Sequence, residues 1–177
     1  NVWSSTDGVN WTNDTASPDY SGNFTGVGAV FDNKMWVFLI GPSNLDAWSS
    51  TDGISWTNET SGGTPPTTDI TDRFAAVSFN DKLWLIGGSG SSPSDSDDVW
   101  SSTDGATWTQ VNSGADFGGR QGLQAVSFDD KIWVLGGYQV SSGETYTGEV
   151  WYSTNGITWT ETVETAHWEE SGITRYD

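Results

Sequence analysis

The sequence contains no cysteine, a single histidine (His167) and only six lysine and arginine residues among 177. The lack of cysteine excludes disulfide bonds, thiolate nucleophiles and cysteine-ligated metals within these residues. A single histidine disfavours a histidine-based catalytic triad or metal cluster within these residues. No apolar run reaches about 18 residues, so we expect no membrane-spanning helix and no membrane insertion in this segment. Several common kinds of enzyme site are therefore disfavoured.

The shortage of basic residues gives a formal net charge of −18, with 24 acidic residues against 6 basic ones. Proteins that bind nucleic acids use lysine and arginine to neutralise phosphates, so we expect no nucleic-acid partner. The apolar content is only 34%, but the chain has 12 tryptophans, and each buries roughly 150–250 Å² in a core. The composition therefore predicts a folded, acidic globular protein.

Two short sequence elements recur along the chain. The first is a pair of tryptophans eight residues apart with Asp-Gly or Asn-Gly between them, in four copies at 2–12, 47–57, 99–109 and 150–160. The second reads Phe, two Asp or Asn residues, Lys, any residue and Trp; its copies begin at Phe31, Phe79 and Phe128, 48 and 49 residues apart. A period near 50 residues is typical of stacked or radial repeat proteins.

Each period predicts four short antiparallel strands. In the clearest copy, strands at 75–79 and 83–86 flank an Asn80-Asp81 turn, and strands at 98–103 and 106–111 flank an Asp104-Gly105 turn. Asn, Asp and Gly tolerate the positive φ angles of tight hairpin turns, and no stretch has helical periodicity. The sequence therefore predicts an all-β fold, a β-propeller of four-stranded antiparallel blades.

Counting strands predicts about three and a half blades, an incomplete ring. A half-blade is expected at 1–22, complete blades at 23–60, 74–111 and 123–160, and the start of a connection to a further blade at 161–177. Propellers usually have four to eight blades. We expect the missing strands to belong to a longer polypeptide; an oligomer that completes the ring is the alternative.

The repeats resemble those of kelch-type propellers, the fold of the central domain of galactose oxidase. The kelch pattern has an arginine before the first strand, a Gly-Gly pair after the second, then an aromatic residue and a tryptophan. The matching residues are Arg73, Gly87, Gly88, Trp100 and Trp108 in one repeat and Arg120, Gly136, Gly137, Trp151 and Trp159 in the next. The first repeat departs from the pattern, since Phe38-Leu39 replaces the glycine pair.

The Ser-Thr-Asp-Gly-x-x-Trp hairpins also resemble the Asp-box of sialidase-type propellers, although they are one residue shorter. Repeats of this Ser-, Thr- and Trp-rich style are similar to those of large microbial, notably archaeal, surface proteins. This resemblance implies an extracellular or cell-surface location.

Ligand-binding residues are expected at one mouth of the propeller channel. The fold implies that Arg73, Arg120 and Arg175 ring this mouth, and some kelch propellers hold acidic peptides through arginine at this place. A guanidinium can hold a carboxylate through two parallel hydrogen bonds. The alternative is that each arginine pairs with a nearby loop aspartate, such as Asp72 or Asp116. Arg73 lies two residues nearer its strand than Arg120 does.

Aromatic side chains in the loops of the same face are further candidates. These are Tyr138, Tyr146 and Trp168. Exposed aromatic rings there could stack on sugars or anchor a protein partner; alternatively, they cover loop backbone.

Acidic residues have structural and metal-binding interpretations. Asp95, Asp97 and Asp98 offer oxygen ligands to Ca²⁺, but their loop lacks the Gly and Glu of an EF-hand, and a solvated loop is the alternative; no metal or cofactor is assigned. We expect the turn residues Asp7, Asp52, Asp104 and Asn155 to accept hydrogen bonds from their own hairpins. Lys34, Lys82 and Lys131 are expected to be solvated turn residues.

Four Asn-x-Thr sequons are candidate N-glycosylation sites. They lie at Asn10, Asn13, Asn23 and Asn58, all within the first 60 residues. Their clustering favours an exported protein.

Two functions remain open at this point. The first is a non-catalytic propeller module of an exported or cell-surface protein, with a structural or a protein- or glycan-binding role. The second is part of a carbohydrate-active, sialidase- or glycosidase-like propeller enzyme whose catalytic residues lie outside this segment. The copper site of galactose oxidase needs a Cys-linked Tyr, which is missing here, and no carboxylate pair stands out by its spacing. No catalytic residue is assigned.

Overall fold

The computed structural model describes residues 1–15, 26–40, 45–60, 63, 66, 70, 72–90, 95–140 and 145–163. Every regular element within these ranges is a β-strand. The strands form three four-stranded antiparallel sheets and two separate strand pairs. The predicted all-β fold of four-stranded antiparallel blades is therefore confirmed.

The first two four-stranded sheets are meanders in which neighbouring strands follow one another along the sequence, and in the third the β13–β14 pair is inserted between β12 and β15. The first sheet contains β3 (Gly26–Phe31), β4 (Lys34–Ile40), β5 (Leu45–Ser50) and β6 (Thr57–Asn58). The second contains β7 (Ala75–Phe79), β8 (Lys82–Ser89), β9 (Asp95–Ser102) and β10 (Thr109–Ser113). The third contains β11 (Gln124–Phe128), β12 (Lys131–Leu135), β15 (Val150–Ser153) and β16 (Thr160–Val163).

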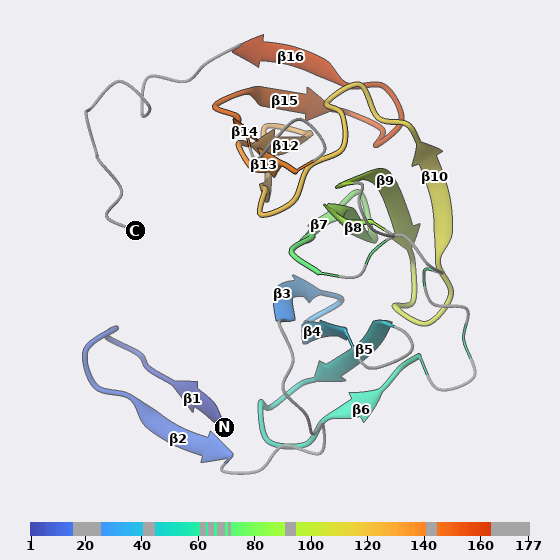
Figure 1. The fold of residues 1–177 in the computed structure, drawn as a ribbon. Helices are drawn as coiled ribbons and strands as arrows, with labels where there is room; N and C mark the ends of the chain where they lie inside the picture. Colours follow the sequence, from blue (N-terminus) through green and yellow to red (C-terminus); the bar gives the residue numbers. More distant parts are fainter. Residues whose placement is uncertain are drawn as a thin grey trace.

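The two strand pairs are smaller. β1 (Val2–Ser4) pairs with β2 (Thr12–Thr15), and β13 (Tyr138–Gln139) pairs with β14 (Thr145–Tyr146). The sheets fan around a common axis, with β2, β6, β10 and β16 at the periphery, and no described strand lies between β16 and the β1–β2 hairpin (Figure 1). Strand β7 contacts both β3 and β11, which are the first strands of the neighbouring sheets.

The turns between the first two strands of each sheet have left-handed backbone conformations. Asn80 and Asp81 have φ of 48° and 53°, and the pairs Asp32-Asn33 and Asp129-Asp130 have φ between 49° and 55°. Two consecutive positive φ angles define the two-residue turn that matches the twist of a β-hairpin. The turn predicted at Asn80-Asp81 is confirmed, and its equivalents have the same conformation.

Hydrogen bonds between residues of the same turn stabilise the tryptophan-flanked hairpins. Asp104 Oδ1 accepts hydrogen bonds from the backbone N–H groups of Ala106 (2.9 Å) and Thr107 (2.8 Å). Ser102 Oγ accepts one from Gly105 N (2.8 Å), and Trp108 Nε1 donates one to Gly105 O (3.0 Å). These bonds hold Ala106 and Thr107 in the turn, so β10 begins at Thr109 and the strand predicted from residue 106 is too long.

The same bonds lower the pKa of the turn carboxyl groups. The backbone N–H of Thr107, followed by other hydrogen bonds, holds the pKa of Asp104 below its ordinary value of 3.8. Hydrogen bonds from Ser55 and Ile54 lower the pKa of Asp52 in the same way. Asn155 accepts the equivalent two bonds through its amide oxygen at 2.8 and 3.0 Å. The expectation that these residues cap their own turns is therefore confirmed.

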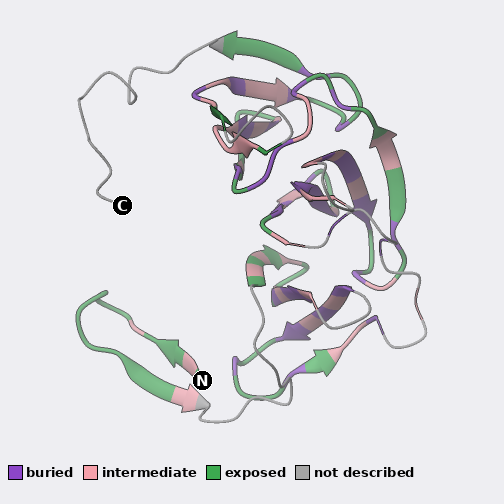
Figure 2. Cartoon of the chain, viewed as in Figure 1, coloured by how far each residue is buried: buried purple, intermediate pink, exposed green. Residues whose placement is uncertain are grey.

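The core lies between the sheets rather than inside any one of them (Figure 2). One cluster joins the first and second sheets and includes Trp36, Phe38, Leu83, Leu85 and Trp108. The other joins the second and third sheets and includes Phe79, Trp84, Ile132, Val134 and Trp159. A single sheet of this size exposes its apolar faces unless a neighbour covers them.

A glycine of each later hairpin lies directly on a tryptophan of the preceding sheet. A Cβ atom built on Gly105 would overlap the ring of Trp36, and one on Gly156 would overlap the ring of Trp84. Both glycines have φ of 74°. We call these two pairs the glycine–tryptophan contacts; they require glycine both for its conformation and for its lack of a side chain.

The Gly87-Gly88 pair after β8 also brings two sheets together. Its φ angles are 63° and 112°, and the register of β8 against β9 shifts between Ile86 and Gly88. Gly88 N donates to Arg120 O of the following repeat at 2.9 Å. In the first sheet, where Phe38-Leu39 replaces the glycine pair, β4 continues in regular register with β5 to Ile40.

Candidate functional site

Four of the six predicted ligand-binding residues lie in the part of the chain that the structure describes: Arg73, Arg120, Tyr138 and Tyr146. Arg175 and Trp168 lie outside the described residues, as does the sequon residue Asn23. The four described residues occupy two different environments.

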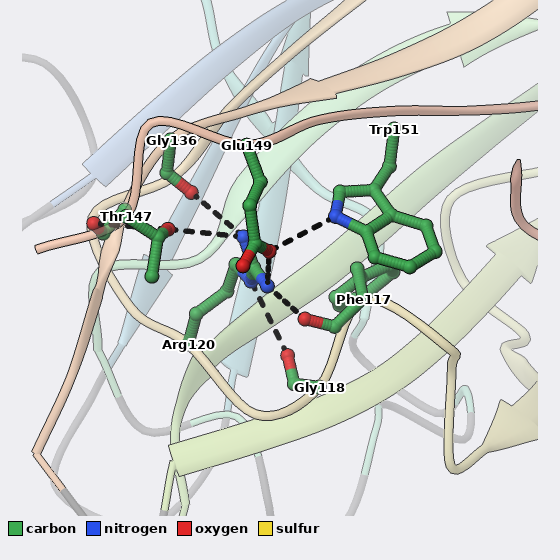
Figure 3. Close-up of polar contacts among 8 residues, drawn as sticks. Phe117, Gly118, Arg120, Gly136, Thr147, Glu149 and Trp151 are labelled. Atoms are coloured by element: carbon green, nitrogen blue, oxygen red, sulfur yellow. Dashed lines mark hydrogen bonds and ion pairs between the residues drawn. The ribbon is translucent and has the colours of Figure 1, made fainter. Parts of the chain in front are cut away.

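Arg120 is fully buried, and Figure 3 shows the polar groups around its guanidinium. Its guanidinium forms an ion pair with Glu149 Oε2 at 2.6 Å. It also donates hydrogen bonds to Thr147 Oγ1 at 3.1 Å, to Gly136 O and Gly118 O at 3.4 Å, and to Phe117 O. Trp151 Nε1 donates to the same Glu149 oxygen at 3.0 Å.

This network leaves no exposed donor on Arg120, whose side chain is only 1% exposed. Arg120 therefore holds the segment before β11 to the segment before β15, and its guanidinium does not face a ligand. The partner suggested by the sequence, Asp116, is wrong, because Asp116 Oδ2 instead accepts a hydrogen bond from Trp159 N at 3.2 Å. Removing one partner of a buried ion pair is strongly destabilising, so we expect Arg120 to contribute to stability.

Arg73 does not occupy the position equivalent to Arg120. Backbone bridges join Asp72 to Ser89 in one repeat and Gln121 to Tyr138 in the next, so Asp72 corresponds to Gln121. Arg73 then corresponds to Gly122, and the two have φ of 54° and 68°. Unlike that of Arg120, the Arg73 side chain is 52% exposed. The two-residue offset in the sequence therefore changes the environment of the arginine.

Arg73 and the two tyrosines come together across the boundary of two sheets. The guanidinium carbon of Arg73 lies 5.6 Å from the ring centroid of Tyr138. The Tyr138 and Tyr146 ring centroids are also 5.6 Å apart, with planes tilted by 43°. Tyr146 is 59% exposed. We refer to Arg73, Tyr138 and Tyr146 as the Arg–Tyr surface.

Neighbouring polar groups orient this surface. Arg73 Nε lies 3.4 Å from Asp72 Oδ2, which confirms the pairing suggested by the sequence. Arg73 Nη1 donates to Gln121 Oε1 at 3.4 Å, and the Tyr138 hydroxyl donates to the same oxygen at 2.9 Å. The guanidinium and the Tyr138 ring are thus fixed relative to each other by one shared acceptor.

Gln121 is the residue that sequence reasoning missed. It is 7% exposed, its Oε1 also accepts from Ser89 Oγ at 2.9 Å, and its Nε2 donates to Asp95 Oδ1 at 2.8 Å. Aligning the two repeats by their strand pairing would have indicated it, because Gln121 occupies the position of Asp72 in the preceding repeat. A buried amide with four hydrogen-bond partners positions its neighbours.

A comparison with protein families places this geometry in context. The model of the DUF6242 beta propeller domain matches residues 1–170. The chain belongs to the DUF6242 beta propeller domain family. No match was found among the curated proteins. With three four-stranded sheets arranged around an axis, the family assignment confirms the predicted β-propeller, whose ring is not closed by the described residues.

The calcium candidates Asp95, Asp97 and Asp98 of this DUF6242 propeller chain differ in their burial and partners. Asp95 lies on β9, and its carboxylate accepts hydrogen bonds from Gln121 Nε2 and from Val140 N (2.7 Å). Asp98, further along the same strand, is buried, whereas Asp97 is half-buried. Among the described residues, no group of three or more His, Asp or Glu side chains could hold a metal ion. The alternative, a solvated loop, is wrong from residue 95 onward, since β9 begins there.

Three sequon residues of the propeller are described. Asn10 is exposed, and its Nδ2 donates to Asp7 Oδ2 at 2.8 Å; Asn13 is exposed on β2. Asn58 is half-buried on β6, and its Oδ1 accepts from Thr60 N at 3.0 Å and from Thr60 Oγ1 at 2.8 Å. The amide nitrogen that would carry a glycan is therefore engaged within its own hairpin at Asn10.

Helices long and apolar enough to cross a membrane are absent from the described ranges.

Proposed function

We propose that this chain is a non-catalytic β-propeller module of an exported or cell-surface protein, and that it binds a protein or glycan ligand at the Arg–Tyr surface. The observation that carries the proposal is the half-exposed Arg73 guanidinium held over the Tyr138 ring beside the exposed Tyr146. Of the candidate ligand-binding residues that the structure describes, these three meet on one accessible surface.

The chemistry of this surface favours a ligand with both a carboxylate and a flat apolar face. A guanidinium pairs with carboxylates, and aromatic rings stack on sugar rings or on apolar side chains. Because Gln121 and Tyr138 hold Arg73 in place, binding costs little ordering of the arginine. Acidic sugars and acidic peptides satisfy both requirements.

The proposal includes the type of repeat from which the propeller is built. We regard them as kelch-type repeats with hairpins similar to the Asp-box, as in large microbial surface proteins. The Gly87-Gly88 pair and the carboxylate-capped turn at Asp104 support this description. The four sequons support export, and an intact mass of the native protein would reveal attached glycans.

The proposal also covers nucleic acid, the remaining blades and cofactors. The strong acidity argues against a nucleic-acid partner. The remaining blades would come from the rest of a longer polypeptide, and an oligomer that completes the ring is the less favoured alternative. The proposed function requires no cofactor.

The competing proposal is that the propeller forms part of a carbohydrate-active enzyme whose catalytic residues lie elsewhere. The exposed aromatic rings favour a sugar ligand in that case too, so binding alone does not separate the two. Turnover of a sugar substrate by the complete protein would separate them, because the non-catalytic module predicts binding without turnover.

The experiment is a screen of the complete chain against arrays of acidic glycans and acidic peptides. Replacing Arg73 with Asn, which tolerates the positive φ, should weaken binding of the best ligand at least about tenfold by removing the charge-assisted hydrogen bonds. Tyr146→Ala should weaken it similarly. Lys131→Gln is the matched control, since it removes one surface cation far from this surface and should leave affinity unchanged.

If Arg73→Asn and Tyr146→Ala bind as well as the unmodified chain, the Arg–Tyr surface is not the binding site. Equal loss in Lys131→Gln would instead indicate a general effect of net charge.

A further inference from the structure

The β1–β2 hairpin corresponds to the outer half of a four-stranded sheet. Its sequence at 2–12 repeats the one at 47–57, which spans part of β5 and the start of β6. In the three complete sheets the strand equivalent to β1 has neighbours on both edges, whereas β1 is hydrogen-bonded in a sheet with β2 alone among the described strands. The hairpin is largely exposed (Figure 2), with Trp3 51% and Trp11 58% exposed.

An apolar groove of about 660 Å³ lies between this hairpin and the first sheet. Its lining includes Val2 and Trp3 on one side and Gly28, Val30, Met35 and Val37 on the other. The groove therefore lies where the inner two strands of a preceding sheet would be.

Burial in the other repeats shows what normally covers this face. Met35 corresponds to Leu83 and Ile132 in the second and third repeats. Leu83 and Ile132 are fully buried against the preceding sheet, whereas Met35 is 38% exposed. Val37, on the same face of β4, is half-buried, whereas its equivalents are fully buried, namely Leu85 and Val134. The face of β4 that carries Met35 and Val37 is thus apolar and more exposed than its equivalents in the other two sheets.

The surroundings of Gly53 also differ from those of the equivalent glycines. It has the φ of 74° found at Gly105 and Gly156, which each lie on a tryptophan ring of the preceding sheet. At Gly53, a Cβ would meet only the side chains of Met35 (3.3 Å) and Val2 (3.7 Å) within 4 Å, with no indole among them. The site is shaped for a tryptophan that the described residues do not place there.

We propose that a two-stranded hairpin of the Phe-Asp-Asn-Lys-x-Trp type, from a further repeat of the same polypeptide, pairs with β1 on the side opposite β2 and fills this groove. Backbone pairing along a sheet edge supplies affinity, and the alternating apolar side chains supply specificity. Its tryptophan lies on Gly53, as Trp36 lies on Gly105. This inference is independent of ligand binding at the Arg–Tyr surface.

A second copy of this chain is a poorer occupant. Its three hairpins of the required type, β3–β4, β7–β8 and β11–β12, are already the inner strands of four-stranded sheets. A complete sheet does not fit either, because Val2 and Trp3 of β1 already line the groove.

The test is an extended chain in which a copy of residues 26–45 is fused directly before Asn1. This reproduces the spacing between the second element and the tryptophan hairpin found in the first repeat. The amide exchange of β1 should slow at least about tenfold because β1 gains a second neighbour, and the Tm should rise. The control extension carries Ser in place of the copies of Phe31 and Trp36, with equal length and charge.

Equal exchange rates in the two extended chains would overturn the proposal. A second variant, Gly53→Val, should abolish the protection in the extended chain, and its effect in the unextended chain measures the backbone strain alone. Protection that persists in the extended Gly53→Val variant would contradict the position of the tryptophan. Concentration-dependent protection of β1 in the unextended chain, with a dimer by light scattering, would identify a second copy as the occupant instead.

Discussion

At the residue scale, Arg73 and Arg120 differ in position by two residues relative to their first strands. As a result Arg73 lies at the surface and Arg120 in the core. Arg120 has its guanidinium enclosed by Glu149, Thr147 and three carbonyl groups, and Arg73 is left half-exposed on a left-handed backbone. The sequence singled out both arginines. It did not show that their registers differ, since the bridges that define the register join residues distant along the chain.

Arg120 should be a major contributor to stability. Replacing it with Met leaves Glu149 without its ion pair and removes hydrogen bonds from several carbonyl groups, which should lower the free energy of unfolding by about 3–5 kcal/mol. Urea denaturation at pH 7 measures this change.

The control for Arg120→Met is Arg73→Asn, whose exposed ion pair contributes about 0–1 kcal/mol. Similar losses in both variants would contradict a structural role specific to Arg120. The double variant Arg120→Met with Glu149→Gln should recover part of the loss, because no unpaired carboxylate remains.

The turn aspartates should make stability depend on pH in the acid range. The folded pKa values of Asp52 and Asp104 lie below their ordinary value of 3.8, so their stabilising contribution is complete above that value and declines as the pH falls through the lower folded values. The double variant Asp52→Asn with Asp104→Asn should therefore have a lower Tm than the unmodified chain at pH 7. Calorimetry should find a smaller difference at pH 3, because asparagine does not titrate.

Asn155 shows that an amide fits the same turn geometry, so the substitutions should preserve the fold. A difference in Tm that stays constant from pH 7 to pH 3 would contradict the hydrogen-bond origin of the lowered pKa values.

At the scale of elements, the repeated hairpins were largely predictable. The strand at 75–79 and the Asn80-Asp81 turn were located correctly because both depend on local alternation and turn chemistry. The start of β10 was placed three residues too early, since the Asp104 side chain competes with strand pairing for the next N–H groups. β9 was placed three residues too late, because its first residues gain partners from the next repeat, such as Gln121.

The glycine–tryptophan contacts allow the contribution of sheet-to-sheet packing to stability to be measured. Gly105→Ala should destabilise the chain through both backbone strain and overlap with the Trp36 ring, by about 2–4 kcal/mol in total. Gly8→Ala is a matched control, since Gly8 has φ of 73° but nothing within 4 Å of an added Cβ. It should cost only the strain, about 1 kcal/mol.

Thermal or urea unfolding of the two variants gives the comparison. Equal losses for Gly105→Ala and Gly8→Ala would mean that the contact between the sheets contributes nothing beyond the turn.

At the scale of the whole molecule, the number of sheets and their antiparallel topology could be read from the repeat. The sequence also placed the residues of the Arg–Tyr surface on one face, but it did not predict that Arg73 contacts the tyrosines. Tyr138 and Tyr146 belong to the small β13–β14 pair, and Arg73 precedes β7 in another sheet. They meet because the second and third sheets pack face to face around the axis (Figure 1). No local pattern encodes that distance.

The central claim is that the sheets stabilise one another, and that this packing creates the surface proposed to bind a ligand. Hydrogen exchange measured by mass spectrometry on Gly156→Ala tests it most directly, because Gly156 lies on Trp84 of the neighbouring sheet. The account predicts faster exchange throughout β7–β10 as well as in the third sheet, although the substitution lies in the turn between β15 and β16. Faster exchange confined to the β15–β16 hairpin would contradict it.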